Sequence, residues 1–336
     1  MERQFKVVRV ETTGSQAVMV EEAEELAKVN AELIGADCTT EDEIIKGAKD
    51  ADVIITMRAR MTRRVMGGLP KCQAIVRYGI GYDMVDIGAA TDNHIIVINI
   101  PDFCFEEVSN HAIALLLACA KKLVLLNNLT KRGRWAQAKR TQAPMGSIHG
   151  QTLGLVGCGN VGRMTARKAQ CFSLRVLGCD HYVDKSLAKE SGIILVSLPE
   201  LLKESDFVSV HTPLNEETRH LIGEREFRQM KPNAYFINTA RGAIVDEAAL
   251  IKALQEKWIA GAGLDVFEKE PIDPDNPLLK MDNVVILPHS ASYSDTAFKQ
   301  LRTSVGQEAA RVVSGRWPKN VVNKGVRPKV NLIKED

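Results

Sequence analysis

Short apolar runs separated by amphipathic stretches recur along the 336 residues of the chain. In the first part of the chain, the runs that we expect to form strands are residues 6–10, 52–57, 74–77 and 95–99. In the second part, they are residues 152–157, 174–179, 193–196, 206–210, 234–238, 260–265 and 283–287. Strands that alternate with helical patterns are typical of βαβ units and of parallel sheets. The pattern therefore predicts an α/β protein with two doubly wound parallel-sheet domains.

Four longer stretches between or after these runs carry other patterns. Residues 18–34 have a helical pattern with an acidic face, and residues 106–126 form a long apolar pattern that begins with two glutamates. Acidic residues suit a helix N-terminus because they oppose the helix dipole, so we expect residues 106–126 to be one helix that bridges two domains. The basic residues 130–148 are predicted to be an irregular arm, which either packs on another subunit or is a plain surface loop. Residues 292–314 predict one amphipathic helix.

Composition excludes several classes of protein. Hydrophobic residues make up 45% of the chain and charged residues 26%, which is ordinary for a globular protein. The net charge is only +2, so the protein has no strong positive field that would attract nucleic acid or an anionic membrane. The longest apolar stretch, residues 112–120, is too short to span a bilayer, and the N-terminus lacks the apolar core of a signal peptide. The seven cysteines are scattered without C-x-x-C spacing, which indicates reduced thiols and no metal site. We expect a cytoplasmic protein with neither a nucleic-acid nor a membrane partner.

A glycine-rich turn follows the apolar run at residues 153–156. Gly157, Gly159 and Gly162 form a G-x-G-x-x-G pattern between a predicted strand and a helical pattern. Such a turn lets the backbone approach a pyrophosphate, which then lies at the helix N-terminus. Asp180 ends the next predicted strand about twenty residues further on, where a carboxylate accepts hydrogen bonds from ribose hydroxyls and repels a 2′-phosphate. We therefore predict NAD as the cofactor rather than NADP.

Polar residues follow four more of the predicted strands. Doubly wound sheets bind ligands at the carboxyl ends of their strands. Hydride transfer to a ketone creates an alkoxide, so a proton donor such as histidine is required, and a neighbouring carboxylate favours its charged form. An arginine fork matches a substrate carboxylate. Two histidines, His211 and His289, are candidates for the proton donor, and two glutamates are candidates for its carboxylate partner. His111 lies on an apolar helical pattern and is expected to be a core or interface residue rather than a ligand. The residues concerned are His211, Thr212, Thr239, Ala240, Arg241, Asp265, Glu268, Glu270 and His289.

At these residues the chain resembles the D-isomer-specific 2-hydroxyacid dehydrogenase family. The matching stretches, in family order, are RYGIGYDMVDI (77–87), EEVSNHAIALLL (106–117), GLVGCGNVG (154–162), HTPL (211–214), NTARGAIVDEAAL (238–250), GLDVFEKEP (263–271) and NVVILPH (283–289). The resemblance implies a flavodoxin-like substrate domain and a Rossmann NAD domain around a cleft. It implies that residues 1–104 and 298–336 form the substrate domain and residues 105–297 the NAD-binding domain. It also implies a homodimer joined through the nucleotide domain.

The resemblance also implies roles for individual residues. Arg241 would anchor the substrate carboxylate, His289 would be the acid/base, and Glu270 would pair with His289. The implied cofactor-binding residues are Gly157, Gly159, Asn160, Val161, Gly162, Asp180, His211, Thr212, Thr239, Ala240, Arg241, Asp265 and His289. The expected substrate-binding residues are Arg58, Arg60, Tyr78, Gly79 and Arg241. Of these, Arg58 and Arg60 are either solvated loop charges or ligands for a second acidic group on the substrate.

We therefore expect an NAD-dependent D-2-hydroxyacid dehydrogenase, which transfers hydride between NAD(H) and C2 of a small 2-oxo or 2-hydroxy acid. Residues 100–108 and 292–324 resemble the sub-branch of C-terminal binding protein corepressors, which motivates an NAD(H)-sensing scaffold as the alternative. Ser292 stands where that sub-branch has a tryptophan, and Ser290-Ala291-Ser292 replaces the isoleucine, alanine and glycine of the broader family pattern. A dehydrogenase for a non-carbon acid such as phosphite is a third hypothesis. The sequence leaves the identity of the acid open.

Overall fold

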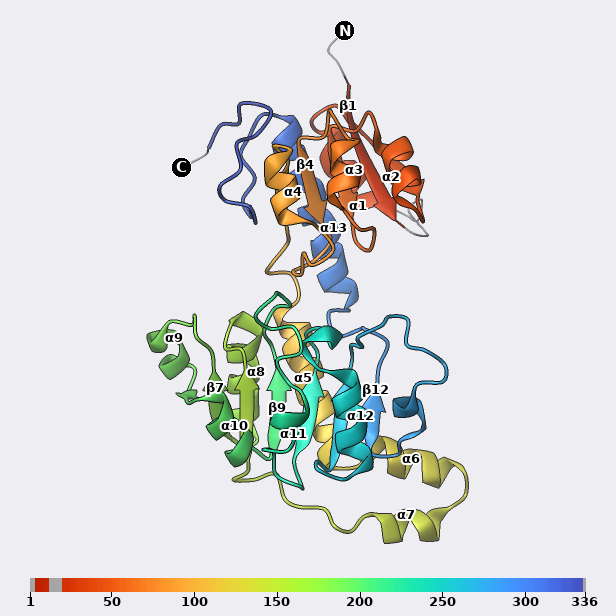
Figure 1. Cartoon of the computed structure of the whole chain (residues 1–336), viewed down its shortest axis with the longest axis vertical. Helices are drawn as coiled ribbons and strands as arrows, with labels where there is room; N and C mark the ends of the chain where they lie inside the picture. Colours follow the sequence, from red (N-terminus) through yellow and green to blue (C-terminus); the bar gives the residue numbers. More distant parts are fainter. Residues whose placement is uncertain (1–3, 12–19, 335–336) are drawn as a thin grey trace. The chain divides into compact units, whose positions relative to one another are not determined.

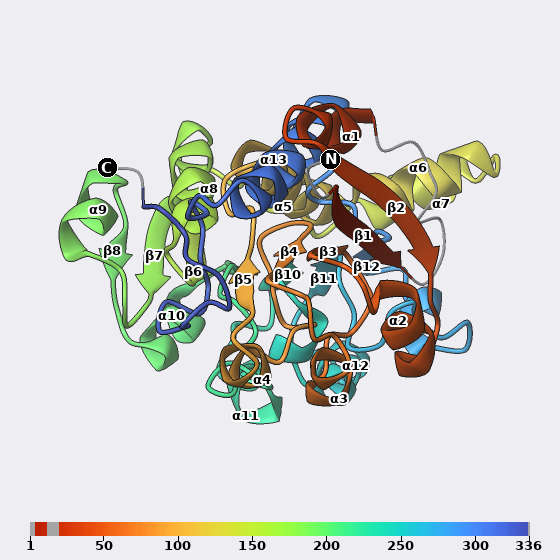
Figure 2. The same ribbon diagram turned by 90° about the horizontal axis from the view of Figure 1, so that it is seen from above.

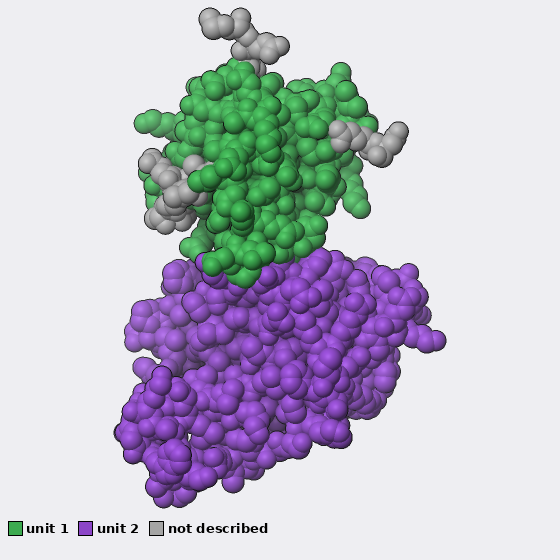
Figure 3. Space-filling view, turned by 180° about the vertical axis from the view of Figure 1, so that it is seen from behind, with its two compact units in different colours: residues 1–103, 294–336 green, residues 104–293 purple. Residues whose placement is uncertain are grey.

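The chain folds into two compact units, each built on its own parallel sheet. The structure is a computed structural model, and it describes residues 4–11 and 20–334. Unit 1 comprises residues 1–103 and 294–336, and unit 2 comprises residues 104–293 (Figure 3). The prediction of two α/β units with parallel sheets is confirmed.

Unit 1 contains a five-stranded parallel sheet with the strand order β2-β1-β3-β4-β5, which is the flavodoxin-like order. Helices α1 and α13 lie on one face of this sheet, and α2, α3 and α4 lie on the other (Figure 2). The last long helix thus completes a sheet that the N-terminal part of the chain builds. The strands are β1 (Phe5–Glu11), β2 (Ala31–Asp37), β3 (Val53–Thr56), β4 (Ala74–Arg77) and β5 (Ile96–Ile98). The helices are α1 (Val20–Ala27), α2 (Glu41–Ala48), α3 (Arg63–Gly67), α4 (Ile87–Asp92) and α13 (Asp295–Val313).

The prediction of a helix over residues 18–34 is wrong in its second half. Helix α1 ends at Ala27, and β2 pairs with β1 from Ala31 onwards. Strand β2 is the edge strand of the sheet, and most of its side chains are only partly buried. An edge strand of this kind has no continuous apolar run, which is why the sequence pattern did not indicate it. Residues 18 and 19 lie outside the described residues.

Unit 2 contains a seven-stranded parallel sheet with the strand order β12-β11-β10-β9-β6-β7-β8 (Figure 1). All seven predicted strands are present, in the Rossmann order with one further strand at β12. They are β6 (Thr152–Val156), β7 (Arg175–Cys179), β8 (Ile194–Leu195), β9 (Phe207–Val210), β10 (Tyr235–Asn238), β11 (Gly261–Leu264) and β12 (Val284–Ile286). The helices are α5 (Phe105–Ala120), α6 (Leu123–Lys131), α7 (Trp135–Thr141), α8 (Asn160–Cys171), α9 (Lys185–Glu190), α10 (Leu198–Glu204), α11 (Glu224–Phe227) and α12 (Glu247–Gln255).

Two hydrophobic cores cover the two faces of the unit 2 sheet. One core contains apolar residues of α5, α8 and α9, and the other contains residues of α10, α11 and α12. Both cores contain fully buried strand residues, such as Leu155 and Val208. Burial on both faces explains why these strands appear in the sequence as continuous apolar runs. It also leaves the strand ends as the places where polar side chains gather.

The first part of unit 2, residues 104–148, differs from prediction in two details. The helix expected over residues 106–126 is two helices, because α5 ends at Ala120 and Lys122 takes a left-handed conformation (φ 49°) before α6 begins. The arm at residues 130–148 is not wholly irregular, because it contains α7. Among the described helices, none is long and apolar enough by itself to cross a membrane. Only α5 and α6 together reach that length and composition, across a bend of 61°.

Candidate active site

The glycine-rich turn joins β6 to α8 at the carboxyl end of the unit 2 sheet. Gly157 has a φ of 98°, and Gly159 caps the N-terminus of α8. A Cβ atom on Gly162 would lie 2.3 Å from the carbonyl oxygen of Gly157, whereas a Cβ on Gly159 would meet no atom within 4 Å. The turn itself therefore requires glycine at 162, and glycine at 159 leaves open space at a helix N-terminus. A pyrophosphate fits such a site.

The first residues of α8 are braced by one arginine. Asn160 and Val161 open the helix, where backbone N–H groups have no partner in the preceding turn. Arg163 donates to the carbonyl oxygen of Cys158 (3.1 Å) and to Oδ1 of Asn160 (2.7 Å). These bonds hold the turn against the helix, so the N–H groups are oriented before any anion arrives.

Asp180 lies directly after β7 and is tied to the glycine-rich turn. Its Oδ2 accepts a hydrogen bond from the N–H of Cys158 (2.7 Å), and its Oδ1 accepts from the N–H groups of Tyr182 (2.8 Å) and Val183 (3.0 Å). Each carboxylate oxygen can accept more than one bond, so the ribose hydroxyls can still bind here. The carboxylate stands where the sequence predicted it, beside the turn.

His211 and Thr212 follow β9, on the other side of β6. A Cβ atom on Gly157 would lie 2.7 Å from the backbone nitrogen of Thr212, so this loop packs directly on the turn. Nε2 of His211 lies 2.9 Å from Oγ of Ser209. Burial lowers the pKa of His211 to about 4, so its ring is neutral near neutral pH. A neutral ring cannot supply a proton, which argues against His211 as the acid.

A turn built around Asn238 follows β10 and carries Arg241. The buried side chain of Asn238 donates to the carbonyl oxygen of Arg241 (3.0 Å) and accepts from the N–H of Ala240 (3.0 Å). Nη1 of Arg241 donates to the carbonyl oxygen of Ala240 (2.7 Å). The hydroxyl of Thr239 is buried and has no hydrogen-bond partner among the described residues. An orphaned hydroxyl at a strand end is a position that a ligand can satisfy.

The turn that carries Arg241 packs tightly on the loop after β11. A Cβ atom on Gly242 would lie 1.9 Å from the carbonyl carbon of Phe267, so only glycine permits this contact. The charge of Arg241 acts on Glu270, three residues beyond Phe267. The two strand-end loops thus bring an arginine and a carboxylate together in unit 2.

Glu270 pairs with His289. Nδ1 of His289 lies 2.6 Å from Oε2 of Glu270, and the N–H of Phe267 donates to Oε1 of Glu270 (3.0 Å). Burial alone would raise the pKa of Glu270, but its hydrogen bonds and the charges of His289 and Arg241 lower it. The carboxylate is therefore ionised over a wide pH range. The pairing occupies Nδ1 of His289 and leaves Nε2 for another partner.

The other glutamate candidate has a different partner. Oε1 of Glu268 lies 2.6 Å from Nε2 of His220. Both side chains of this second pair are exposed. Glu268 and Glu270 are two positions apart in the sequence, and the structure gives each its own histidine. The choice that the residues left open is settled in favour of Glu270 as the partner of His289.

Asp265 holds the loop that carries His289. Its Oδ1 accepts from the N–H of Ser290 (2.9 Å), and its Oδ2 accepts from the N–H of Ala291 (2.8 Å). Burial alone would raise the pKa of Asp265, but these bonds and His111 lower it. Nε2 of His111 lies 3.4 Å from Oδ1. The sequence predicted a core or interface position for His111 and missed this contact, because nothing in a helical pattern indicates a partner so far along the chain.

In unit 1, Arg58 and Arg60 are exposed on the loop after β3. The buried carboxylate of Glu11, at the end of β1, accepts hydrogen bonds from the N–H groups of Met57 and Arg58. Burial raises the pKa of Glu11, and these bonds oppose the rise. Glu11 thus fixes the backbone of the loop that carries Arg58 and Arg60, a role that no sequence pattern indicated.

Tyr78 and Gly79 follow β4, the next strand of the unit 1 sheet. The N–H of Tyr78 donates to the carbonyl oxygen of Thr56 (2.9 Å), so this amide already has a partner. The tyrosine ring is buried, with the guanidinium of Arg9 5.1 Å from its centroid. Gly79 has a φ of 109°. Of the two amides expected to grip a carboxylate, that of Gly79 is the better candidate.

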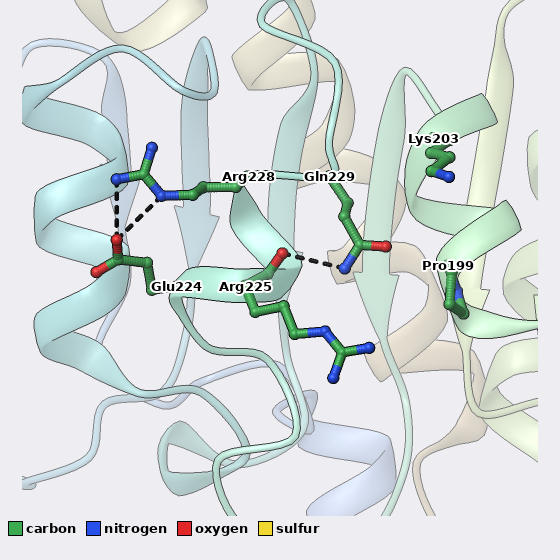
Figure 4. Close-up of a pocket in the computed structure, with 6 residues that line it drawn as sticks. All are labelled: Pro199, Lys203, Glu224, Arg225, Arg228 and Gln229. Carbon is green, nitrogen blue, oxygen red and sulfur yellow. Dashed lines mark hydrogen bonds and ion pairs between the residues drawn. The ribbon is translucent and has the colours of Figure 1, made fainter.

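A surface depression elsewhere in unit 2 contains none of the predicted site residues. Its lining comes from α10 and from α11 with the residues just after it, where Arg228 bends back to Glu224 and Gln229 donates to the carbonyl oxygen of Arg225 (Figure 4). The depression is wide open and lies away from the strand ends, so it is not a candidate for the chemistry. Within the described ranges, no group of three His, Cys, Asp or Glu side chains is placed to hold a metal ion.

Known proteins share both the sequence pattern and the fold. The model of the family "D-isomer specific 2-hydroxyacid dehydrogenase, NAD binding domain" matches residues 113–291. A glyoxylate reductase of Korarchaeum cryptofilum is 42% identical over 285 residues, which are 84% of this chain and 86% of that protein. The D-lactate dehydrogenase of Aquifex aeolicus, solved with NAD and lactic acid, has a TM-score of 0.81 at 29% identity and covers 94% of this chain and 99% of its own. An NADPH-dependent glyoxylate/hydroxypyruvate reductase of Sinorhizobium meliloti, solved with NADP and malonate, has a TM-score of 0.85 at 28% identity and covers 97% of this chain and 99% of its own.

The fold and the strand-end residues define a nicotinamide-dependent oxidoreductase that acts on CH–OH groups. The chain belongs to the D-isomer-specific 2-hydroxyacid dehydrogenase family, and its cofactor is NAD. The residues at the glycine-rich turn fit this cofactor, because space, free N–H groups and a carboxylate meet there. The relatives compared are reductases and dehydrogenases, so the alternative of an NAD(H)-sensing scaffold has no support from them.

Proposed function

We propose that this protein interconverts a small 2-oxo acid and its D-2-hydroxy acid, with glyoxylate, hydroxypyruvate and pyruvate as the first substrates to test. The names of the compared relatives support this choice of class. The observation that carries the proposal is the 2.6 Å contact between His289 and Glu270, with Arg241 close enough for its charge to act on Glu270. The reaction needs a proton donor, a protein carboxylate that pairs with this donor, and a cationic group that binds the carboxylate of the substrate.

Each of the three residues has a separate task in this proposal. The bound cofactor supplies the hydride for C2. Arg241 binds the substrate carboxylate with its planar fork and so orients the carbonyl group. His289 donates the proton from Nε2 to the carbonyl oxygen, and Glu270 accepts the hydrogen bond from Nδ1 and stabilises the charged ring.

The cofactor would be held by the residues at the strand ends of unit 2. We propose that the turn at Gly157–Gly162 binds the pyrophosphate and that Asp180 binds the adenosine ribose. Thr212 and the turn at Thr239–Ala240 would line the path of the cofactor towards its nicotinamide end, where Asp265 holds the His289 loop. In unit 1, the amide of Gly79 would help to bind the substrate carboxylate, and Arg58 and Arg60 would bind a second acidic group where the substrate has one.

We also propose a homodimer formed through unit 2, in the cytoplasm. Exposed apolar side chains on α6 and α7 support a partner surface there, namely Leu123, Val124 and Trp135. All seven cysteines are free thiols, as a reducing compartment requires. Sedimentation of the wild type and of Trp135→Glu tests the dimer, and a wild-type protein that sediments as a monomer would contradict it.

His289→Gln and Arg241→Ala test the chemistry. Each should lower kcat/KM for the best 2-oxo acid by about 100-fold to 10,000-fold, while NADH binding measured by calorimetry stays within a few-fold of wild type. His220→Gln is the matched control, because it disrupts the other histidine–glutamate pair and should leave turnover unchanged. Full activity of His289→Gln, or an equal loss in His220→Gln, would contradict the assignment.

The same assay separates the substrate hypotheses. NADH oxidation is followed with glyoxylate, hydroxypyruvate, pyruvate and a 2-oxo acid that carries a second carboxylate, and NAD reduction is followed with phosphite. Turnover of a 2-oxo acid supports the proposal. Turnover of phosphite alone would replace it with the non-carbon acid hypothesis, which uses the same arginine and histidine.

A further inference from the structure

A hydrogen bond between Tyr182 and Glu217 joins the loops on the two sides of the glycine-rich turn. The hydroxyl of Tyr182 donates to Oε2 of Glu217 at 2.8 Å. Tyr182 lies just after β7, and Glu217 lies in the loop after β9. The strand order places β7 and β9 on either side of β6, and β6 leads into the turn. The bond therefore spans the end of the strand where the pyrophosphate binds.

This bond lies at the adenosine end of the cofactor site. Asp180, two residues before Tyr182, accepts the N–H of Tyr182 and also the N–H of Cys158 in the turn. His289 follows β12, which is at the opposite edge of the sheet from β7 and β8. A dinucleotide that lies along the strand ends has its nicotinamide towards β12 and its adenosine towards β7. Tyr182 and Glu217 thus stand beside the adenosine half.

Both partners are accessible to a ligand. Tyr182 is 81% exposed, which is unusual for an aromatic side chain of this size, and Glu217 is also exposed. An exposed bond of this kind adds little to the free energy of unfolding. Its effect is to fix the tyrosine ring and the carboxylate of Glu217 relative to each other, in a loop that begins at Asp180, since the phenol would otherwise sample several rotamers in water.

We propose that Tyr182 and Glu217 form the outer wall of the adenosine site and that the carboxylate of Glu217, together with Asp180, rejects the 2′-phosphate of NADP. The tyrosine ring offers an apolar face to adenine. The carboxylate of Glu217 repels a phosphate dianion more strongly than it affects the neutral ribose hydroxyls of NAD. The inference rests on the NAD site and is independent of the substrate and of the roles of Arg241 and His289.

Glu217→Gln tests the charge, with Glu216→Gln as the matched control in the same exposed loop. Dissociation constants for NADH and NADPH are measured by calorimetry without substrate. Glu217→Gln should bind NADPH about three- to tenfold more tightly than wild type, with NADH affinity changed by less than about twofold, and the gain should shrink as salt is added. If the ratio of the two constants is the same in Glu217→Gln and Glu216→Gln, the proposal is overturned.

Tyr182→Phe and Tyr182→Ala separate the hydroxyl from the ring. Tyr182→Phe releases Glu217 and should improve NADPH binding in the same direction as Glu217→Gln, by a smaller factor. Tyr182→Ala should weaken the binding of AMP by about fivefold, because adenine loses a contact face. It should weaken the binding of adenosine 2′,5′-bisphosphate by a smaller factor, because Glu217 is released as well. Unchanged AMP binding in Tyr182→Ala would overturn the proposal that Tyr182 forms part of the adenosine site. These probes carry no nicotinamide, so their result is distinguishable from a failure of the proposed catalytic residues.

Discussion

Glycine serves two different needs within the same turn. At 162 it avoids a clash within the protein, because a Cβ would lie 2.3 Å from the carbonyl oxygen of Gly157. At 159 no protein atom lies within 4 Å of the position of a Cβ, so glycine leaves open space at the N-terminus of α8. A sequence motif treats both positions alike, whereas their physical reasons differ.

Gly159→Ala and Gly162→Ala should therefore separate folding from cofactor binding. Gly159→Ala should keep the wild-type free energy of unfolding and lose NADH affinity by about tenfold or more, since the methyl group occupies the space for the pyrophosphate. Gly162→Ala should lower the free energy of unfolding by about 1–3 kcal/mol, because backbone must shift. Urea unfolding and calorimetry measure the two effects. Equal destabilisation by both substitutions would contradict the distinction.

His211 makes the stability of unit 2 depend on pH in a defined direction. Burial lowers its pKa to about 4 in the folded protein, whereas an unfolded histidine titrates near about 6.5. As the pH falls below about 6.5, the unfolded chain takes up the proton first, so the native state loses stability down to about pH 4. Above about pH 6.5 the effect vanishes. The difference in pKa corresponds to at most about 3 kcal/mol.

His211→Gln should remove this part of the acid sensitivity. The free energy of unfolding from urea titrations should fall less steeply between about pH 6.5 and about pH 4 than in wild type. The exposed His220→Gln is the control and should keep the wild-type slope. If the free energy of unfolding of His211→Gln falls with pH as steeply as that of wild type, the ring of His211 is not buried in its neutral form.

At the scale of elements, the segment after α13 covers the edge strand β5. The N–H of Val322 donates to the carbonyl oxygen of Val97 (2.8 Å). Oδ1 of Asn323 accepts from the N–H of Val97 (2.8 Å), and its Nδ2 donates to the carbonyl oxygen of Ile95 (2.9 Å). An uncovered edge would expose a row of backbone groups to other chains. One buried asparagine and the neighbouring Val322 thus satisfy backbone groups of β5, one of the two edge strands of unit 1.

Asn323→Ala should lower the free energy of unfolding of unit 1 by about 2–4 kcal/mol, because it leaves two buried backbone groups without partners. The exposed Lys324→Ala is the neighbouring control and should change stability by less than about 0.5 kcal/mol. Thermal and urea unfolding followed by circular dichroism measure the loss. A stability of Asn323→Ala within error of Lys324→Ala would show that water replaces the side chain without cost.

At the scale of the whole molecule, the predicted site residues are distributed over the two units. The residues that fit the cofactor belong to unit 2, while Gly79 and the loop that carries Arg58 and Arg60 belong to unit 1. Anything that binds the native state stabilises it by mass action. Cofactor binding without substrate should therefore act first on unit 2.

Hydrogen exchange measures this division. With NADH at about 100 times its dissociation constant, the amides of β6 and β9 should gain up to about 2.7 kcal/mol of protection, more than those of β1 and β3 in unit 1. Gly159→Ala under the same NADH concentration is the control and should show a smaller gain. An equal gain in Gly159→Ala would place the cofactor away from the glycine-rich turn.

How far the sequence predicted each element depended on its burial. Central strands such as β6 and β9 are buried on both faces and stand out as apolar runs. Strand β2 lies at an edge with half-exposed side chains and was assigned to a helix. The break between α5 and α6 was also missed, because two lysines between apolar residues are compatible with a continuous helix and do not indicate the left-handed conformation of Lys122.

The sequence by itself determined the alternation of strands and helices, the glycine-rich turn with Asp180, and the family, because these depend on neighbours in the chain or on motifs in a fixed order. The family resemblance implied that Glu270 pairs with His289, but only the tertiary structure shows this pair and gives Glu268 a different partner, His220. His289 meets Glu270 from 19 positions away, and His220 meets Glu268 from 48 positions away. The contacts of His111 with Asp265 and of Tyr182 with Glu217 are of the same kind. Such pairs form where loops from different strands converge at one edge of a sheet, and no local pattern specifies which side chains then meet.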